Sequence, residues 1–341
     1  MKTVIKGFGI GVLLLVAVIG VAMIYVTRSL PKLAPADQSL KIEVTQARVA
    51  RGNYLVHHVQ DCYSCHSIRD WSQFGGPVIA GSEFRGGETL FDDRIGLPGK
   101  IPPKNLTPYN LKNYSDGELV RVIRTGVRRD GQPLFPVMPY QNYAVMSQED
   151  LYSVIAYLRT LKEAPNDVPE HELIFPVSVI VHTIPQEAPP FPAPVDPKNT
   201  VEYGRYLVRQ GSCSNCHSPV DAHHNELKGQ YLSGGQEFPL LNIDGDMSAL
   251  PGAAVRTANL TPDNETGTGK WSKAEFIARF ADWRGKSGQA KVQKLKNGEF
   301  QSPMPWLYYS GMTDADLGAI YDFLRTVKPV RHEVKKFTPP T

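Results

Sequence analysis

The chain has 341 residues, which is enough for two or three domains of ordinary size. Its formal net charge is only +3, from 37 basic and 34 acidic residues, so a nucleic-acid partner is not expected. Its 29 Gly and 28 Pro follow no repeat period, which favours short helices joined by long loops over a fibrous or low-complexity chain.

The first expected element is an apolar helix. The stretch Gly7–Thr27 contains no charged residue and is long enough to cross a bilayer core of ~30 Å at about 1.5 Å per residue. Because it lacks a convincing cleavage site, residues 1–30 are predicted to be an uncleaved anchor, and a removed signal peptide is the alternative. Lys2 and Lys6 precede the span, which predicts a single-pass protein of the cytoplasmic membrane with a periplasmic remainder. Residues 31–46 then form a tether.

The motif Cys-x-x-Cys-His occurs twice, at Cys62–His66 and at Cys213–His217. Two thiols one helical turn apart can each form a thioether to one edge of a porphyrin, and the adjacent imidazole can bind iron. The alternatives are a zinc site, which needs four ligands together, and a redox pair, which does not require the histidine. The two motifs use all four cysteines of the chain. The sequence therefore predicts two covalently bound haem c groups, attached through Cys62, Cys65, Cys213 and Cys216 and ligated by His66 and His217.

Residues 47–165 and 198–333 are two versions of one unit. Each opens with a helix that runs into the cysteine motif, repeats the sequence Asn-Leu-Thr-Pro, and closes with a helix whose apolar residues recur at helical spacing. Capping boxes are predicted at Ser115 with Glu118 and at Ser272 with Glu275, and the closing helices are predicted to start at Ser147 and Thr313. No strand-like alternation recurs in both units. We therefore expect a mainly α protein with two tandem domains after one transmembrane helix.

The units are joined by a connector, residues 166–197, whose proline-rich end predicts an extended and semi-rigid spacer. Its apolar run, residues 173–181, is too short to span a membrane. We expect it to pack on one or both domains, with a membrane-surface contact as the alternative. Residues 334–341 are expected to be a tail.

The distal position of each haem needs a further assignment. Met138 and Met304 each lie in a Met-Pro-aromatic sequence shortly before the closing helix, and they are predicted to be the sixth ligands. The alternative for each is a loop methionine that packs on the core. Met146 and Met312, directly before helix caps, are expected to be core residues. The other histidines are expected to be surface or core residues, with His224 as the substitute ligand if Met304 is not one; they are His57, His58, His171, His182, His223, His224 and His332.

In their order along the chain, the Gly-x-Tyr-Leu helix, the Cys-x-x-Cys-His motif, the Met-Pro loop and the closing helix resemble the class I cytochrome c domain. The resemblance implies that the carbonyl of Pro77, in a Gly-Pro loop, orients His66. The second unit has no proline in register, which leaves the partner of His217 open. More narrowly, Asn-Leu-Thr-Pro and the Trp-Ser-x-x-Glu-Phe segment resemble the cytochrome c subunits of membrane-bound alcohol and gluconate dehydrogenases. Those usually carry three haem motifs, whereas this chain carries two.

These features predict an electron-transfer protein that is not itself an enzyme. It would relay single electrons on the periplasmic side, as a subunit of, or shuttle for, a respiratory complex or dehydrogenase. The expected redox partners are a dehydrogenase, a quinol-oxidising complex or a terminal oxidase. The rival functions are a dihaem peroxidase and a haem-based gas sensor, each of which needs an open distal site.

Overall fold

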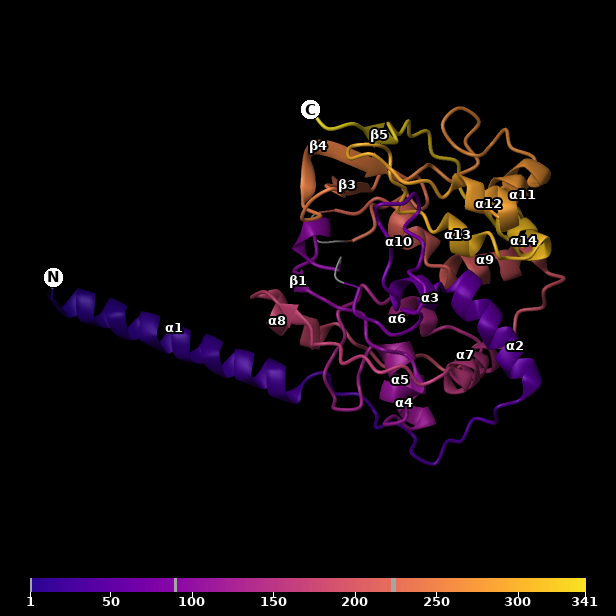
Figure 1. Cartoon of the computed structure of the whole chain (residues 1–341). Helices are drawn as coiled ribbons and strands as arrows, with labels where there is room; N and C mark the ends of the chain where they lie inside the picture. The colour runs from indigo at the N-terminus through magenta and orange to yellow at the C-terminus, as the bar shows by residue number, and fades with distance from the viewer. Residues whose placement is uncertain (1, 89–90, 222–224) are drawn as a thin grey trace.

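A computed structural model describes residues 2–88, 91–221 and 225–341 of the chain. One long N-terminal helix projects from a body made of short helices and long loops (Figure 1). The body is mostly helical, as the sequence predicts.

The elements before residue 198 are α1 (Lys2–Ser29), α2 (Gln46–Tyr54), the π-helix η1 (Leu55–Val59), α3 (Cys62–Cys65), the 3-10 helix η2 (Asp93–Ile95), β1 (Gly99–Lys100), α4 (Pro108–Leu111), α5 (Asp116–Thr125), α6 (Tyr140–Tyr143), α7 (Gln148–Thr160), β2 (Glu172–Leu173), α8 (Val177–Ile180) and the 3-10 helix η3 (Val181–Thr183). The later elements are α9 (Thr200–Gln210), α10 (Cys213–His217), β3 (Glu237–Leu241), β4 (Ala249–Arg256), α11 (Lys273–Ala281), α12 (Gly285–Lys291), α13 (Trp306–Tyr309), α14 (Asp314–Leu324) and β5 (Phe337–Thr338).

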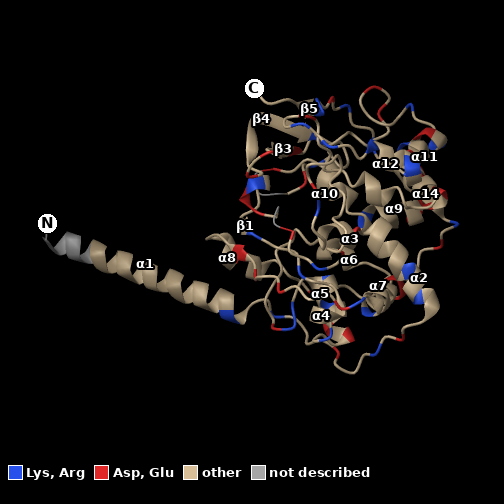
Figure 2. Cartoon of the chain, in the orientation of Figure 1, with Lys and Arg blue, Asp and Glu red and all other residues tan. Residues whose placement is uncertain are grey.

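Helix α1 contains the only stretch of the described residues that is long and apolar enough to cross a membrane, Phe8–Ser29. None of that stretch is buried against the body, and Figure 2 shows it without charged residues until its C-terminal end. Its side chains therefore expose an apolar surface along the whole span.

The predicted helix starts are confirmed. Ser115 and Glu118 form a capping box at the start of α5, and Ser272 and Glu275 form the same box at α11. The hydroxyls of Ser147 and Thr313 accept the N–H three residues on, at the starts of α7 and α14.

Each sequence repeat is built on a crossing of its first and last helices, α2 with α7 and α9 with α14. A glycine lies at each crossing. A Cβ atom on Gly52 would lie 1.9 Å from the carbonyl oxygen of Ser153, and one on Gly204 would lie 1.9 Å from that of Ala319. Only glycine lets the backbones approach this closely. The first helix of each repeat then leads directly into its cysteine motif.

Besides its helices, the second repeat contains a small sheet. Strands β3, β4 and β5 form an antiparallel sheet, in which Val255 is paired with Phe238 and with Phe337. The C-terminal tail is thus partly a sheet strand. A second, two-stranded sheet pairs β1 with β2 of the connector. The two-residue strands β1, β2 and β5 pair with partners more than 70 residues away, so local alternation gives little sign of them.

One continuous hydrophobic core joins the two repeats, from Ile42 to Leu324, and a small separate cluster lies at the three-stranded sheet. The predicted core methionines Met146 and Met312 are both buried in the main core. The segment 285–300, which has no counterpart in the first repeat, packs against the first repeat: the N–H of Phe74 donates to the carbonyl of Gln293 at 2.9 Å.

Candidate functional site

Both cysteine motifs fold as a single helical turn entered from a left-handed residue. Asp61 (φ 51°) precedes α3 and Ser212 (φ 54°) precedes α10. Residues three apart lie on one side of such a turn, so each pair of thiols points to the same side. All four cysteines are free of disulfide bonds, which leaves each pair available for two thioethers.

The entry to each turn is held by a buried tyrosine. The hydroxyl of Tyr143 donates to the carbonyl of Gln60 at 3.3 Å, and that of Tyr309 donates to the carbonyl of Gly211 at 2.7 Å. Gln60 and Gly211 directly precede the left-handed residues, so the two bonds fix equivalent positions of the two repeats.

The histidine of each motif is held in one tautomer by a backbone carbonyl. The Nδ1 atom of His66 lies 2.7 Å from the carbonyl oxygen of Lys104, and Nδ1 of His217 lies 2.8 Å from that of Ala258. A carbonyl oxygen can only accept, so Nδ1 must carry the proton and Nε2 keeps its lone pair. An imidazole in this state is prepared to bind a metal through Nε2.

The carbonyls that orient the histidines belong to the repeated Asn-Leu-Thr-Pro sequence. Lys104 and Ala258 each stand directly before its asparagine. The side-chain amide of Asn105 donates to the carbonyl of Ala164 at 2.8 Å, and that of Asn259 donates to Val330 at 2.8 Å. Each asparagine therefore ties the orienting carbonyl to the chain just after the closing helix.

The same asparagines also fold their own loop. The Oδ1 atom of Asn105 accepts the backbone N–H of Thr107 at 2.8 Å, and Oδ1 of Asn259 accepts that of Thr261 at 2.9 Å. All four of these side chains are buried. These are functional residues that sequence reasoning found only as a repeated motif, and the repetition itself was the signal of their role.

The expectation that Pro77 orients His66 needs correction. The carbonyl of Pro77 accepts the N–H of Asp70 at 2.8 Å, inside a loop closed by the bridge between Arg69 and Val78. The carbonyl of Pro77 is thus used within its own loop, and the imidazole of His66 donates to the carbonyl of Lys104 instead. His217, whose partner the sequence left open, bonds the equivalent carbonyl, that of Ala258.

The two predicted methionine ligands lie in loops with the same backbone shape. The carbonyl of Met138 accepts the N–H of Tyr140 at 2.8 Å, and that of Met304 accepts the N–H of Trp306 at 2.8 Å. The prolines between them have φ −81° and ψ 52°, and φ −78° and ψ 58°, so each loop is an inverse γ-turn. Both methionines are partly buried against the core. Their role as ligands stays a prediction.

Four of the other histidines that the structure describes have hydrogen-bond partners of their own. His57 pairs with the hydroxyl of Tyr157 at 2.9 Å, and the rings of His58, His182 and His332 bond backbone carbonyls. The substitute ligand, His224, lies outside the described residues, as does His223.

Asp61 is the one charged group at the entry to the cysteine turns. Its carboxylate is buried and accepts the N–H and the hydroxyl of Ser64, at 3.2 and 2.5 Å. Burial raises the pKa of Asp61 to about 7, against the lowering effects of Ser64 and Arg69. The second repeat has Ser212 here, so this carboxyl group is present at the first site and absent from the equivalent position of the second.

The two cysteine turns lie on either side of the contact between the repeats. The side-chain amide of Asn142, in α6, donates to Ser212 Oγ and to Asn215 Oδ1 of the other repeat, both at 3.0 Å. In the opposite direction, His58 meets the carbonyl of Tyr308, in α13, at 3.0 Å. The helix after each methionine loop thus touches the cysteine-motif region of the other repeat.

These residues fit a covalently held haem in each repeat. Each site offers two unpaired thiols on one side of a turn and an imidazole with a free Nε2 atom. The hydroxyl of Tyr140, just after the first methionine loop, is buried without a partner among the described residues, as expected of a group that bonds a cofactor. The described residues contain no cluster of three His, Cys, Asp or Glu side chains that could hold a metal ion, so they offer no four-ligand zinc site.

No family model matches the chain. It is 29% identical over 256 residues to the gluconate 2-dehydrogenase cytochrome c subunit of Pantoea cypripedii, which covers 69% of this chain and 51% of that one. It is 27% identical over 294 residues to the fructose dehydrogenase cytochrome subunit of Gluconobacter japonicus, covering 82% and 52%. It is 26% identical over 273 residues to a diheme cytochrome c-type protein of Cereibacter sphaeroides, covering 76% and 87%.

The chain spans about half the length of the dehydrogenase subunits it matches. The homologues are cytochrome c subunits of gluconate, fructose and alcohol dehydrogenases and a dihaem cytochrome c. The predicted resemblance to such subunits is therefore confirmed.

Proposed function

We propose that the chain is a membrane-anchored cytochrome c with two covalently bound haem c groups, which relays single electrons and catalyses no reaction of its own. The observation that carries the proposal is the pair of Cys-x-x-Cys-His turns whose imidazoles are held in the same tautomer by equivalent carbonyls. The proposed domains are residues 47–165 and 198–333, one haem each.

The residues divide the work of holding each haem. Cys62 and Cys65 would attach the first, with His66 as the proximal ligand. Cys213, Cys216 and His217 would do the same for the second. A bound haem supplies one-electron redox chemistry at its iron.

Groups of the chain around each haem would set the ligand strength and the reduction potential of its iron. The carbonyls of Lys104 and Ala258 hold the Nδ1 protons and make the imidazoles more basic ligands. Met138 and Met304 would close the distal side, because their inverse γ-turns hold both thioethers in similar loops before α6 and α13. A thioether opposite an imidazole raises the potential and excludes exogenous ligands, which suits electron transfer.

The membrane part of the proposal rests on α1. Its apolar stretch, 22 residues long, is unburied, and Lys2 and Lys6 precede it. Basic residues before a span favour a cytoplasmic N-terminus, and the body would then lie on the periplasmic side. A protein of this kind would serve a dehydrogenase as redox partner, as the names of its relatives suggest, and pass electrons on to a quinol-oxidising complex or a terminal oxidase.

Haem content and spin state test the proposal together. We expect the purified full chain to carry two covalent haems by mass, to be low-spin in both oxidation states, and to bind no CO when reduced. High-spin ferric iron with turnover of hydrogen peroxide would favour a peroxidase, and rapid CO binding would favour a gas sensor. A chain without porphyrin would end the proposal.

Variants of the attachment residues assign the two haems. Cys65→Ser and Cys216→Ser should each lower the amount of haem covalently bound at the affected site, because only one of the two thioethers can still form there. Tyr63→Phe is the matched control, since it changes a residue inside the first motif without removing a thiol. Undiminished haem in both serine variants would contradict the assigned attachment.

A further inference from the structure

The most exposed apolar side chains of the body lie together in the connector. Outside α1, the three highest exposed fractions among the large apolar side chains described are those of Phe175 (71%), Ile174 (59%) and Ile180 (50%). Single exposed apolar residues are normal on a protein surface, but three within seven residues form a patch. We call residues 174–180 the connector patch.

The connector patch is held in place at both ends. Before it, β2 pairs with β1, and the N–H of Ile174 donates to the carbonyl of Pro98 at 3.0 Å. After it, Val181 and His182 are buried. The apolar side chains are therefore presented by a fixed protrusion and not by a loose loop.

The protrusion is fastened to the C-terminal end of α1. The ring N–H of His182 donates from Nδ1 to the carbonyl of Leu30 at 3.0 Å, one residue after α1 ends. The N–H of Ala34 donates to the carboxylate of Glu187. Helix α8 and η3 both contact α1, and Figure 1 shows α8 projecting from the body on the side where α1 leaves it.

The connector patch is also separate from the cysteine turns. In Figure 1, α8 lies at the edge of the body, well apart from α3 and α10. Two neighbouring surfaces, the bare side of α1 and the connector patch, both expose apolar side chains at one place, and the lipid that would surround α1 can cover both.

We propose that the connector patch inserts its apolar side chains into the membrane interface beside the end of α1, and so forms a second contact with lipid. This inference rests on the proposed anchoring by α1. A single membrane span does not determine how the body is oriented relative to the membrane. A second contact fixes which face of the body meets the membrane. The partner surface is a phospholipid bilayer, entered by Ile174, Phe175 and Ile180.

Photo-cross-linking to lipid tests this directly. The full haem-loaded chain would be placed in nanodiscs that contain a phospholipid with a diazirine in its acyl chain, irradiated, and digested for peptide mapping. We expect adducts on α1 and on the peptide that holds residues 174–180. We expect none on the peptide with Phe300, an apolar residue that is also exposed.

Substitution supplies the control. The double variant Ile174→Ser, Phe175→Ser should lower the adduct yield on the connector peptide by at least about threefold, because it removes most of the apolar surface that enters the bilayer. Phe300→Ser should leave that yield unchanged.

The outcomes separate this inference from the proposed anchoring. Adducts on α1 with none on residues 174–180 would overturn the connector contact and leave the anchor intact. No adduct on either would overturn the anchoring and the connector contact with it. A covalent link from the connector patch to a second copy of the chain, in place of lipid, would show that protein covers the patch and would also overturn the inference.

Discussion

At the scale of single residues, each site depends on where one proton sits. The bonds from His66 to Lys104 and from His217 to Ala258 leave both Nε2 atoms with a free lone pair that can bind a metal. The orienting atoms are backbone oxygens, so substitution of Lys104 or Ala258 by another residue that keeps the loop leaves them in place. The side chains that matter for orientation are therefore the asparagines that follow.

The first prediction concerns the distal methionines. Met138→Ala and Met304→Ala should each lower the potential of one haem by on the order of 100 mV and open that iron to CO, because the thioether that favours the reduced state is lost. Redox titration and CO difference spectra measure both effects.

Met146→Leu is the matched control for these variants. Met146 is buried in the core and its sulfur accepts a hydrogen bond from Gln60 at 3.4 Å, so both potentials should change little. Unchanged titrations in Met138→Ala and Met304→Ala would refute the ligand assignment.

The second prediction uses the pKa of Asp61. That carboxyl is protonated below about pH 7 and ionised above it, because burial raises its pKa to about 7 from an ordinary value of 3.8. Its negative charge favours ferric iron, so the potential of the first haem should fall as pH rises from about 6 to 8. The slope should lie between zero and about 59 mV per pH unit, the limit for one proton per electron.

The second repeat provides an internal control for this effect, since it has Ser212 in place of the aspartate. Asp61→Asn should flatten the dependence of the first haem and leave the second as it was. An equal slope at both haems, retained in Asp61→Asn, would assign the proton to some other group.

At the scale of elements, the position of each cysteine turn is set by a helix crossing. Gly52 and Gly204 let the first helix of each repeat lie directly on the last one. The caps at Ser147 and Thr313 fix where those last helices begin. The turn that carries the thiols thus starts from a rigid pair of helices.

The third prediction tests the crossing. Gly52→Ala should destabilise the protein by about 3 kcal/mol, because its Cβ would lie 1.9 Å from a backbone carbonyl oxygen of Ser153 that cannot easily move. The melting temperature of the haem-loaded chain in one detergent measures the loss.

Gly318→Ala is the control within α14. A Cβ there would meet only ordinary contacts, the nearest being Lys273 Cδ at 3.5 Å. Removing a mid-helix glycine should then raise stability by up to about 1 kcal/mol. Similar melting temperatures for the two variants would show that the crossing tolerates a side chain.

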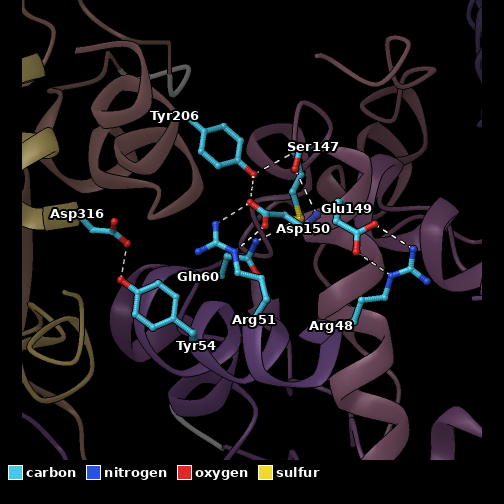
Figure 3. Close-up of polar contacts among 10 residues, drawn as sticks. Arg48, Arg51, Tyr54, Gln60, Ser147, Glu149, Asp150, Tyr206 and Asp316 are labelled. Atoms are coloured by element: carbon cyan, nitrogen blue, oxygen red, sulfur yellow. Dashed lines mark hydrogen bonds and ion pairs between the residues drawn. The ribbon is translucent and has the colours of Figure 1, made fainter. Parts of the chain in front are cut away.

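At the scale of the whole molecule, the two repeats hold each other by reciprocal bonds. The hydroxyl of Tyr54 donates to Asp316 at 2.5 Å, and that of Tyr206 donates to Asp150 at 2.7 Å (Figure 3). Asp150 is also paired with Arg51 of its own repeat at 2.7 Å. Each tyrosine lies on the first helix of one repeat and reaches the closing helix of the other, so the pair relates the two repeats symmetrically.

The fourth prediction follows from this exchange. Tyr54→Phe and Tyr206→Phe should each cost about 1–3 kcal/mol, because each leaves a buried carboxylate short of one donor. We expect the double variant to melt in two steps, one for each repeat, as the contact between them weakens. Calorimetry of the haem-loaded chain distinguishes one transition from two.

Tyr152→Phe is the control for these variants, since the Tyr152 hydroxyl accepts a hydrogen bond from Gln148 of the same helix at 3.0 Å and, among the described residues, makes none to the other repeat. Its melting should match the unchanged protein. A single transition in the double variant at the original temperature would mean that the shared core alone joins the repeats.

By itself the sequence determined the features that depend on spacing within a few residues. The paired thiols and imidazole of each cysteine motif, the capping boxes at Ser115 and Ser272, and the apolar stretch of α1 are all local, so a short window of residues specifies each of them. The mostly helical character followed from the same local patterns.

Only the tertiary structure decided which distant groups meet. The carbonyl opposite His66 comes from Lys104 and not from Pro77, the sheet pairs β4 with the last residues of the chain, and Tyr54 and Tyr206 cross to the other repeat. Each of these contacts joins residues tens to hundreds of positions apart. Which groups meet depends on how the packed helices and loops bring distant backbones together. The residue types at either end of a contact therefore say little about its partner.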